Sequence, residues 1–158
     1  MGQEILVIGY GNSLRSDDGA GISVAETLAQ QQRENLRSLA VHQLTPELAA
    51  DIANSDKVIF VDAAINLASV TVQSLEPEPR GGEFGHTGNP RSLLFLTQAV
   101  YGLVPPAWWV LIPGVNFEFG EQFSAITEEG IGLALKEIEK LINSNPSYTI
   151  TNNNVPGR

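Results

Sequence analysis

Continuous apolar runs and short alternating segments predict the strands of this chain. Residues 5–10 and 58–61 are unbroken aliphatic or β-branched runs, which are typical of strands buried on both faces. Apolar residues also predict strands over 39–44 and 108–112, and the alternation over 70–75 predicts an edge strand.

Apolar residues at intervals of three and four predict helices between these strands. The expected helices cover residues 19–32, 45–54, 89–102 and 127–142. The expected buried face of the first is Ile22, Ala25, Leu28 and Ala29, and that of the last is Ile131, Leu135, Ile138 and Ile142. Strands that alternate with helices predict an α/β fold, a three-layer α/β/α sandwich with a mainly parallel sheet.

The length of 158 residues fits one domain, which we assign to residues 1–144 because no repeat or linker interrupts the pattern. Residues 145–158 are polar and aperiodic and predict a loose C-terminal tail. Residues 76–90 are rich in Gly and Pro and predict a long loop, a feature that is often functional in compact domains.

Composition narrows the classes of function. The net charge of −9 and the lack of a basic stripe argue against nucleic acid as a partner. The chain has no cysteine, which excludes disulfides, thiolate metal sites and cysteine nucleophiles. No apolar run approaches the length that spans a bilayer, and the N-terminus lacks the basic start of a signal peptide, so we expect a cytoplasmic protein without a membrane partner.

Two carboxylates follow predicted strands. Asp18 comes shortly after the first strand and Asp62 directly after the run 58–61. Ligands in open α/β sheets bind beyond the carboxyl ends of the strands, so Asp18 and Asp62 face one crevice if these strands are neighbours. The simpler interpretation is that Asp17 or Asp18 caps the first helix and that Asp62 starts a turn.

The chain has two histidines, His42 and His86. His42 is expected to be packed and hydrogen-bonded near the end of the second strand. Glycines flank the His86 segment and allow that loop to carry the imidazole into the crevice. Asp18, Asp62 and His86 together form an oxygen, oxygen, nitrogen set that suits nickel, zinc or manganese.

Two other sites compete with a metal site. The sequence Gly9-x-Gly11 between a strand and a helix is similar to a dinucleotide-binding turn, but position 14 is Leu, and the acids at 17 and 18 would repel a pyrophosphate. A Ser13–His86–Asp62 triad is the alternative for nucleophilic catalysis, although the Gly-x-Ser-x-Gly motif is absent.

Several of these residues resemble the hydrogenase maturation endopeptidases, a peptidase family often filed with the aspartic proteases. The resemblance is carried by residues 8–21 (IGYGNSLRSDDGAG), by 60–63 (FVDA), and by His86 followed by a helix and Tyr101-Gly102. It extends over about residues 5–142 and implies a twisted five-stranded sheet. The segment 43–48 (QLTPEL) is similar to the branch that serves bidirectional hydrogenases.

The resemblance implies one cut, which removes the C-terminal extension of a nickel-iron hydrogenase large-subunit precursor after nickel insertion. The family's metal-binding residues correspond to Asp18, Asp62 and His86, and the resemblance implies that the nickel comes with the substrate and that other divalent metals can substitute for it. Some relatives have Glu at the position of Asp18, and many have Asp-Gly-Gly-Thr where residues 42–45 read HQLT. A nickel-binding chaperone that guards the precursor without cutting it would use the same three residues.

Overall fold

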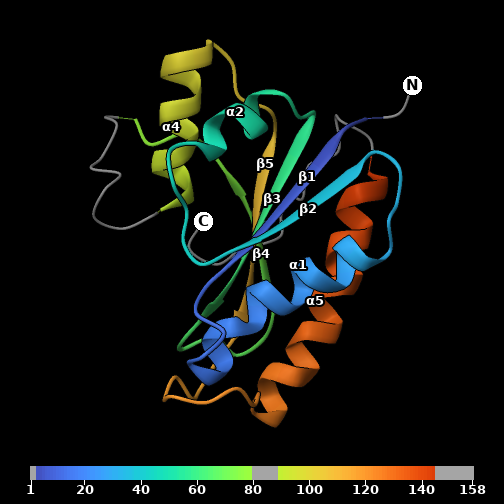
Figure 1. Ribbon diagram of the computed structural model, residues 1–158, viewed down its shortest axis with the longest axis vertical. Coiled ribbons are helices and arrows are strands. Elements are labelled where there is room, and N and C mark those ends of the chain that lie inside the picture. The colour runs from blue at the N-terminus through green and yellow to red at the C-terminus, as the bar shows by residue number, and fades with distance from the viewer. Residues whose placement is uncertain (1–2, 80–88, 145–158) are drawn as a thin grey trace.

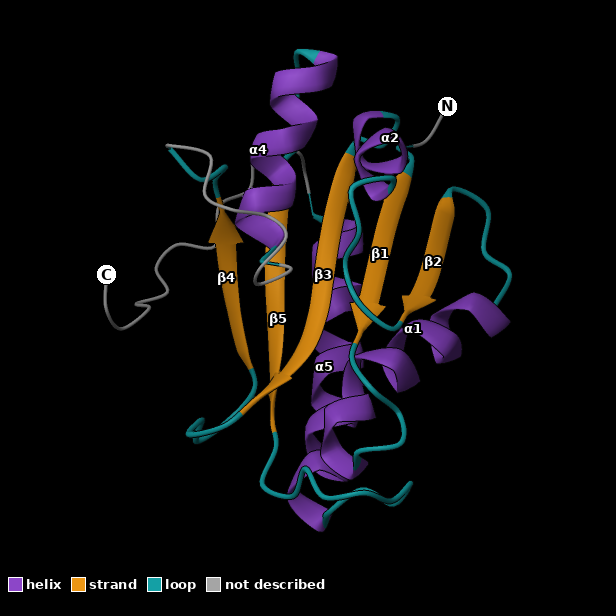
Figure 2. Ribbon diagram, turned by 60° about the vertical axis from the view of Figure 1, so that its left-hand side comes forward, coloured by secondary structure: helices purple, strands orange, loops and turns teal. Residues whose placement is uncertain are grey.

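The computed structural model describes residues 3–79 and 89–144, which form a five-stranded sheet with helices on both faces. The strand order is β2-β1-β3-β5-β4, and every neighbouring pair is parallel except β4 and β5 (Figure 2). The strands are β1 (Ile5–Tyr10), β2 (Leu36–Val41), β3 (Lys57–Ala64), β4 (Thr71–Leu75) and β5 (Ala107–Pro113). The predicted mainly parallel, five-stranded sheet is confirmed.

Helices cover the two faces of the sheet in pairs, which confirms the three-layer α/β/α arrangement. In Figure 1, α1 (Ala20–Gln30) and α5 (Ala125–Asn143) lie on one side of the sheet, and α2 (Leu48–Ala53) and α4 (Pro90–Tyr101) on the other. A short 3-10 helix, η1 (Ser16–Gly19), precedes α1. No helix in the described ranges has both the length and the apolar character needed to cross a membrane.

Side-chain alternation along the strands separates two cores. Val7, Ile59 and Val110 belong to the core beneath α1 and α5. Ile8 and Phe60 belong to the core beneath α2 and α4. Because neighbouring residues of a strand point to opposite faces, Tyr10 and Asp62 share the face of Ile8 and Phe60.

Strand β1 and helix α1 pack backbone against backbone. A Cβ atom at Gly9 would lie 2.0 Å from the carbonyl oxygen of Gly21, and one at Gly21 would lie 2.3 Å from that of Val61. The glycines of the first motif therefore allow α1 to begin directly against β1 and β3. This contact holds the 11–19 loop at the carboxyl ends of both strands.

Several predicted boundaries were wrong. Strand β2 covers Leu36–Val41 rather than 39–44, and α2 begins at Leu48 after a turn rather than at 45. Strand β3 continues to Ala64, so Asp62 lies inside the strand and does not start a turn.

The ends of the later helices follow from their caps. Asn89 caps α4 by accepting a hydrogen bond from the Arg91 N–H, and Gly102 ends it with a left-handed φ of 80°, as the sequence predicts. Helix α5 begins two residues before the predicted Thr127, because Ser124 is its N-cap.

The predicted helix faces are correct only in part. On α1, Ala25 and Leu28 are buried, but Ala29 is exposed and Val24 is buried instead of Ile22. On α5, Ile138 is buried, whereas Ile131, Leu135 and Ile142 pack on the core edge.

Candidate functional site at the carboxyl ends of β1 and β3

Asp18 is positioned by the tight loop that follows β1. Gly11 has a φ of 142°, and a Cβ atom there would lie 2.1 Å from the Asp18 carbonyl oxygen, so this close approach requires glycine. The Asp18 Oδ2 atom accepts a hydrogen bond of 2.8 Å from the Asn12 N–H. The loop thereby folds the carboxylate back toward the end of β1.

Asp62 lies on the neighbouring strand. Val61 pairs with Gly9 in the parallel register of β1 and β3, so Asp62 lies beside Tyr10. The Asp62 Oδ1 atom accepts a hydrogen bond of 2.8 Å from the Ala63 N–H. A backbone donor therefore orients one oxygen of each carboxylate.

The environment of Asp62 favours its protonated form. The pKa of the Asp62 carboxyl is raised to about 7, because burial and the negative charge of Asp18 raise it more than the hydrogen bonds from the Ala63 N–H and the Tyr10 hydroxyl lower it. Asp18 therefore lies close enough to Asp62 for its charge to act on this pKa. Asp62 is consequently a group that exchanges its proton near neutral pH.

Tyr10 and Trp109 form a hydrogen-bonded pair next to Asp62, and neither residue was predicted from the sequence as part of the site. The Trp109 Nε1–H donates to the Tyr10 hydroxyl oxygen over 3.1 Å. Burial raises the pKa of the Tyr10 hydroxyl, and the charge of Asp62 adds to the rise, so Tyr10 keeps its proton. The sequence feature that could have identified Tyr10 is its position, because it lies two residues beyond Ile8 on the same face of β1 and at the carboxyl end of the strand.

Asp17 has a structural role, which corrects its interpretation as a helix cap. Neither η1 nor α1 has a side-chain cap, and the buried Asp17 carboxylate accepts hydrogen bonds from the N–H groups of Val115, Asn116 and Ser124 and from the Ser124 hydroxyl. Burial on its own raises the pKa of Asp17, but these four hydrogen bonds outweigh it and lower the pKa below its usual value. Asp17 therefore joins the loop after β1 to the loop after β5.

The remaining candidates lie in different environments. His86 falls outside the described residues, so the three-residue metal site remains a prediction. His42 follows β2 and is exposed, so the expectation of a packed side chain is wrong. Ser13 is exposed and lines a cavity of about 320 Å³ whose described lining includes neither Asp18 nor Asp62.

The two carboxylates fit part of a divalent-metal site. Among residues 3–79 and 89–144, no three His, Asp or Glu side chains are grouped closely enough to hold a metal ion. Asp18 and Asp62 would supply two oxygen ligands, and a third protein ligand would have to come from elsewhere in the chain.

The positions of Asp17 and Asp18 before α1 argue against the alternative of a dinucleotide-binding site. The turn of η1 places Asp17 and Asp18 ahead of the N-terminus of α1, where a dinucleotide fold would hold its pyrophosphate. The close contacts of Gly9 with Gly21 and of Gly11 with Asp18 account for both glycines of the Gly9-x-Gly11 turn without a bound phosphate.

No protein-family model matches the chain, and no curated protein matches it by sequence. Solved structures do resemble it. The hydrogenase maturating endopeptidase HybD from E. coli aligns with a TM-score of 0.69 and 23% identity, over 85% of this chain and 89% of that chain. The [NiFe] hydrogenase maturation protease HycI from Thermococcus kodakarensis aligns with a TM-score of 0.70 and 21% identity, over 90% and 94% of the two chains.

An endopeptidase from Escherichia coli, solved in solution, gives a TM-score of 0.65 and 25% identity, over 85% of this chain and 89% of that chain. These alignments cover nearly the whole of each protein. At these identities the chain shares the fold of structures named as hydrogenase maturation endopeptidases.

Proposed function

We propose that this protein is an endopeptidase of hydrogenase maturation, which removes the C-terminal extension of a nickel-iron hydrogenase large-subunit precursor in the cytoplasm. The observation that carries the proposal is the pair of carboxylates, Asp18 and Asp62, at the carboxyl ends of adjacent parallel strands. The shared fold with structures named as hydrogenase maturation proteases supports it.

In this proposal the nickel ion belongs to the substrate. Asp18, Asp62 and His86 bind the nickel already seated in the precursor, which holds the adjacent peptide bond in the crevice. Positioning of this kind contributes several kcal/mol to the lowering of a reaction barrier. The carboxylates also keep the site selective for a precursor that carries its metal. The similarity of residues 43–48 to the branch that serves bidirectional hydrogenases supports a substrate of that class.

The chemical step is hydrolysis of one amide. Water adds to the scissile carbonyl, the C–N bond breaks, and the leaving amine takes a proton. Asp62 carries a proton near neutral pH in the metal-free protein, and it releases that proton when its carboxylate binds the nickel. The two aspartates and the family resemblance support classing the protein with the aspartic-type peptidases.

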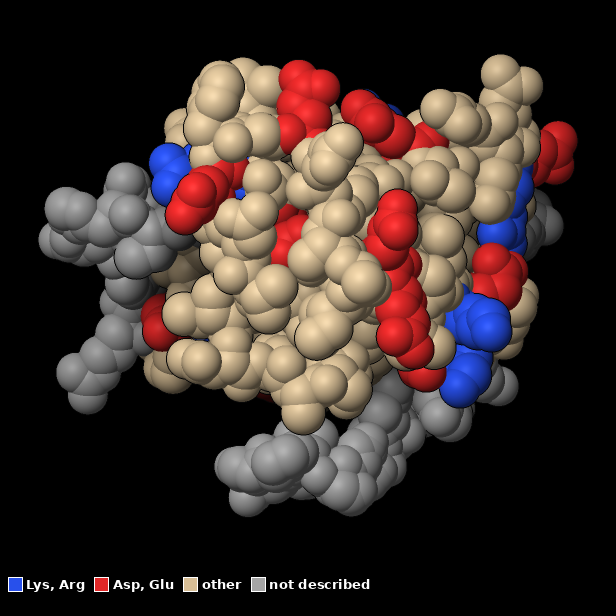
Figure 3. All heavy atoms as spheres, turned by 90° about the horizontal axis from the view of Figure 1, so that it is seen from below, with Lys and Arg blue, Asp and Glu red and all other residues tan. Residues whose placement is uncertain are grey.

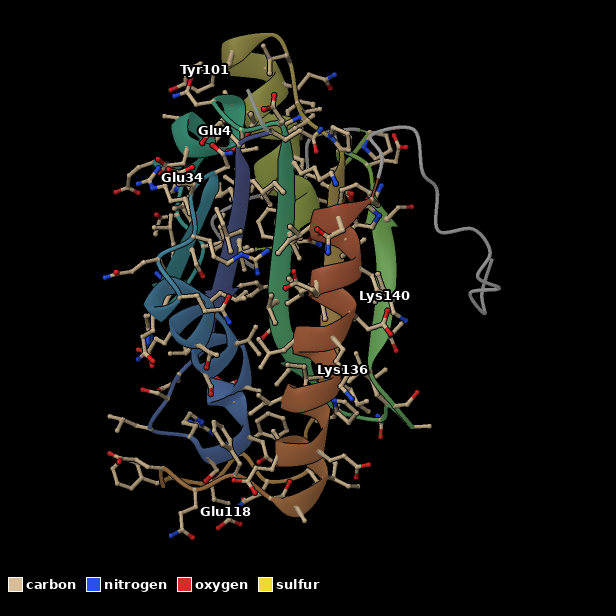
Figure 4. All side chains as sticks on the ribbon, turned by 90° about the vertical axis from the view of Figure 1, so that its right-hand side faces the viewer. Glu4, Glu34, Tyr101, Glu118, Lys136 and Lys140 are labelled. Atoms are coloured by element: carbon tan, nitrogen blue, oxygen red, sulfur yellow. The ribbon has the colours of Figure 1, made fainter. Side chains whose placement is uncertain are left out.

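The test compares nickel-loaded and nickel-free precursor by mass spectrometry of the products. We expect the wild-type protein to shorten only the nickel-loaded precursor. The Asp62→Asn variant should remain folded and leave it uncut, whereas Glu34→Gln, a change at an exposed acid (Figure 4), should process it normally. Cleavage by Asp62→Asn would remove Asp62 from the site, and nickel-dependent binding without any cleavage would favour the chaperone.

A further inference from the structure

Large apolar side chains are exposed at the end of the molecule where β1, β3 and β5 terminate. Phe119 is 86% exposed, Val115 64%, Ile65 60%, Ile126 51% and Leu14 46%. Single exposed apolar residues are ordinary on protein surfaces, but a contiguous group indicates an interaction site. We call these five residues the apolar rim.

Hydrogen bonds between loops place the members of the apolar rim together. The Gly120 N–H donates to the Leu14 carbonyl oxygen over 2.7 Å, which brings Phe119 next to Leu14. The Gly114 N–H donates to the Ala64 carbonyl oxygen over 2.9 Å, which sets the following residues, Val115 and Ile65, at neighbouring positions.

Asp17 joins the start of α5 to the same group. Its carboxylate accepts hydrogen bonds from the N–H groups of Val115 and Ser124. Ser124 is the N-cap of α5, and Ile126 lies in the first turn of that helix. Figure 4 shows this end of the molecule at the bottom, where Glu118 is labelled, and Tyr101 at the opposite end.

The loop that carries Phe119 is hydrogen-bonded to Ser16 at the residues before and after Phe119. The Ser16 hydroxyl donates to the Glu118 carbonyl oxygen over 2.8 Å, and the Ser16 N–H donates to the Gly120 carbonyl oxygen over 2.8 Å. The backbone therefore presents Phe119 to solvent in one conformation, and binding would lose little loop entropy. Rigid exposed aromatic residues are frequent anchors of protein interfaces.

The charges around the apolar rim are mostly negative. The segments 11–19, 62–69 and 114–129 carry one basic residue, Arg15, and their exposed acids are Glu118, Glu121, Glu128 and Glu129. Figure 3 shows this end as a broad uncharged face crossed by acidic groups, with basic groups toward its margin. Such a surface complements a partner that presents apolar side chains flanked by Lys or Arg.

We propose that the apolar rim docks the folded protein substrate through a surface of apolar and basic side chains on that substrate. The inference rests on the proposed function for the identity of the substrate. The loops of the rim follow β1 and β3, the strands that position Asp18 and Asp62, so a protein bound there lies over the carboxylates. The apolar rim therefore binds the substrate, and the carboxylates at the same ends of the strands act in cleavage.

The experiment measures binding and cleavage in parallel with nickel-loaded large-subunit precursor. Binding is followed by titration calorimetry in proteins that also carry Asp62→Asn, which blocks cleavage. Initial rates are measured in the corresponding proteins that keep Asp62. The rim variants are Phe119→Ala and the double charge reversal Glu118→Lys with Glu121→Lys. Tyr101→Ala, which removes an aromatic side chain 47% exposed at the other end, is the matched control.

We expect Phe119→Ala to weaken binding at least tenfold and to raise KM by a similar factor with kcat unchanged. The charge reversal should weaken binding and remove most of its salt dependence, and Tyr101→Ala should change neither. Equal affinities of Phe119→Ala and the Tyr101→Ala control for the precursor would overturn the proposed docking surface. A protein with the wild-type apolar rim that does not bind the precursor would overturn it too. If binding depends on the apolar rim but proteins that keep Asp62 do not cleave the precursor, the docking surface is supported and the proposed peptidase activity is rejected.

Discussion

Trp109 donates its indole N–H to the hydroxyl oxygen of Tyr10 over 3.1 Å and thereby fixes the direction of the Tyr10 proton. With its oxygen occupied as an acceptor, the Tyr10 hydroxyl can donate its proton to Asp62, its neighbour across β1 and β3. The three residues form an ordered chain of donors that ends on the carboxylate. One prediction about the pKa of Asp62 follows from this order, and a second follows from the charge of Asp18.

Removing the Tyr10 hydroxyl should raise the pKa of Asp62. The hydrogen bond from Tyr10 stabilises the charged carboxylate, so Tyr10→Phe should shift the pKa above its value of about 7. Carbon NMR of labelled aspartate side chains in the metal-free protein measures the shift. Tyr101→Phe, at an exposed tyrosine, is the control and should leave the titration unchanged. A lower pKa in Tyr10→Phe would contradict the proposed direction of the hydrogen bond.

Neutralising Asp18 should have the opposite effect. The charge of Asp18 raises the pKa of Asp62, so Asp18→Asn should lower it in the same NMR titration. Burial is the larger cause and persists in the variant, so the pKa should stay above the usual value of 3.8. An unchanged Asp62 titration would mean that the two carboxylates do not share a site.

The central strands were predictable because their sequences follow from full burial. Strands β1 and β3 are buried on both faces, and this requires the continuous apolar runs that the sequence displays. Strand β2 lies at the edge of the sheet and is only half-buried, so Arg37 and Ser38 weaken its pattern and hide its start.

Buried polar residues were not predictable, because their partners are distant in sequence. Lys57 is fully buried at the start of β3, and its Nζ donates to the Leu141 and Ser144 carbonyl oxygens at the end of α5. Asp17 likewise bonds to residues about 100 positions away. The role of Tyr10 depends on the register of β1 against β3, which no single strand encodes.

Asp17 should contribute to stability in a pH-dependent way. Asp17→Asn keeps the size of the side chain but turns an amide group toward N–H donors, so we expect a loss of about 3 kcal/mol in the free energy of unfolding at pH 7. Denaturant titration at several pH values measures it.

The sign of the pH dependence follows from the lowered pKa of Asp17. The folded protein binds the Asp17 proton less readily than the unfolded chain, whose carboxyl titrates near 3.8. The stabilisation is therefore complete above that pH and is lost as pH falls through the folded pKa. The difference between wild type and Asp17→Asn should shrink in acid. A difference that is constant from pH 7 to pH 3 would contradict this assignment.

Two glycine-to-alanine changes should have opposite effects on stability. In Gly9→Ala the new methyl group would lie 2.0 Å from the Gly21 carbonyl oxygen, so β1 and α1 must separate, and we expect a loss of about 3 kcal/mol or more. In Gly132→Ala the methyl group meets no atom within 4 Å, on the exposed side of α5. The higher helix propensity of alanine should then raise the free energy of unfolding by up to about 1 kcal/mol. Urea unfolding of both variants measures the contrast. If Gly9→Ala were as stable as wild type, the backbone contact that seats α1 against β1 and holds the Asp18 loop at the strand ends would be absent.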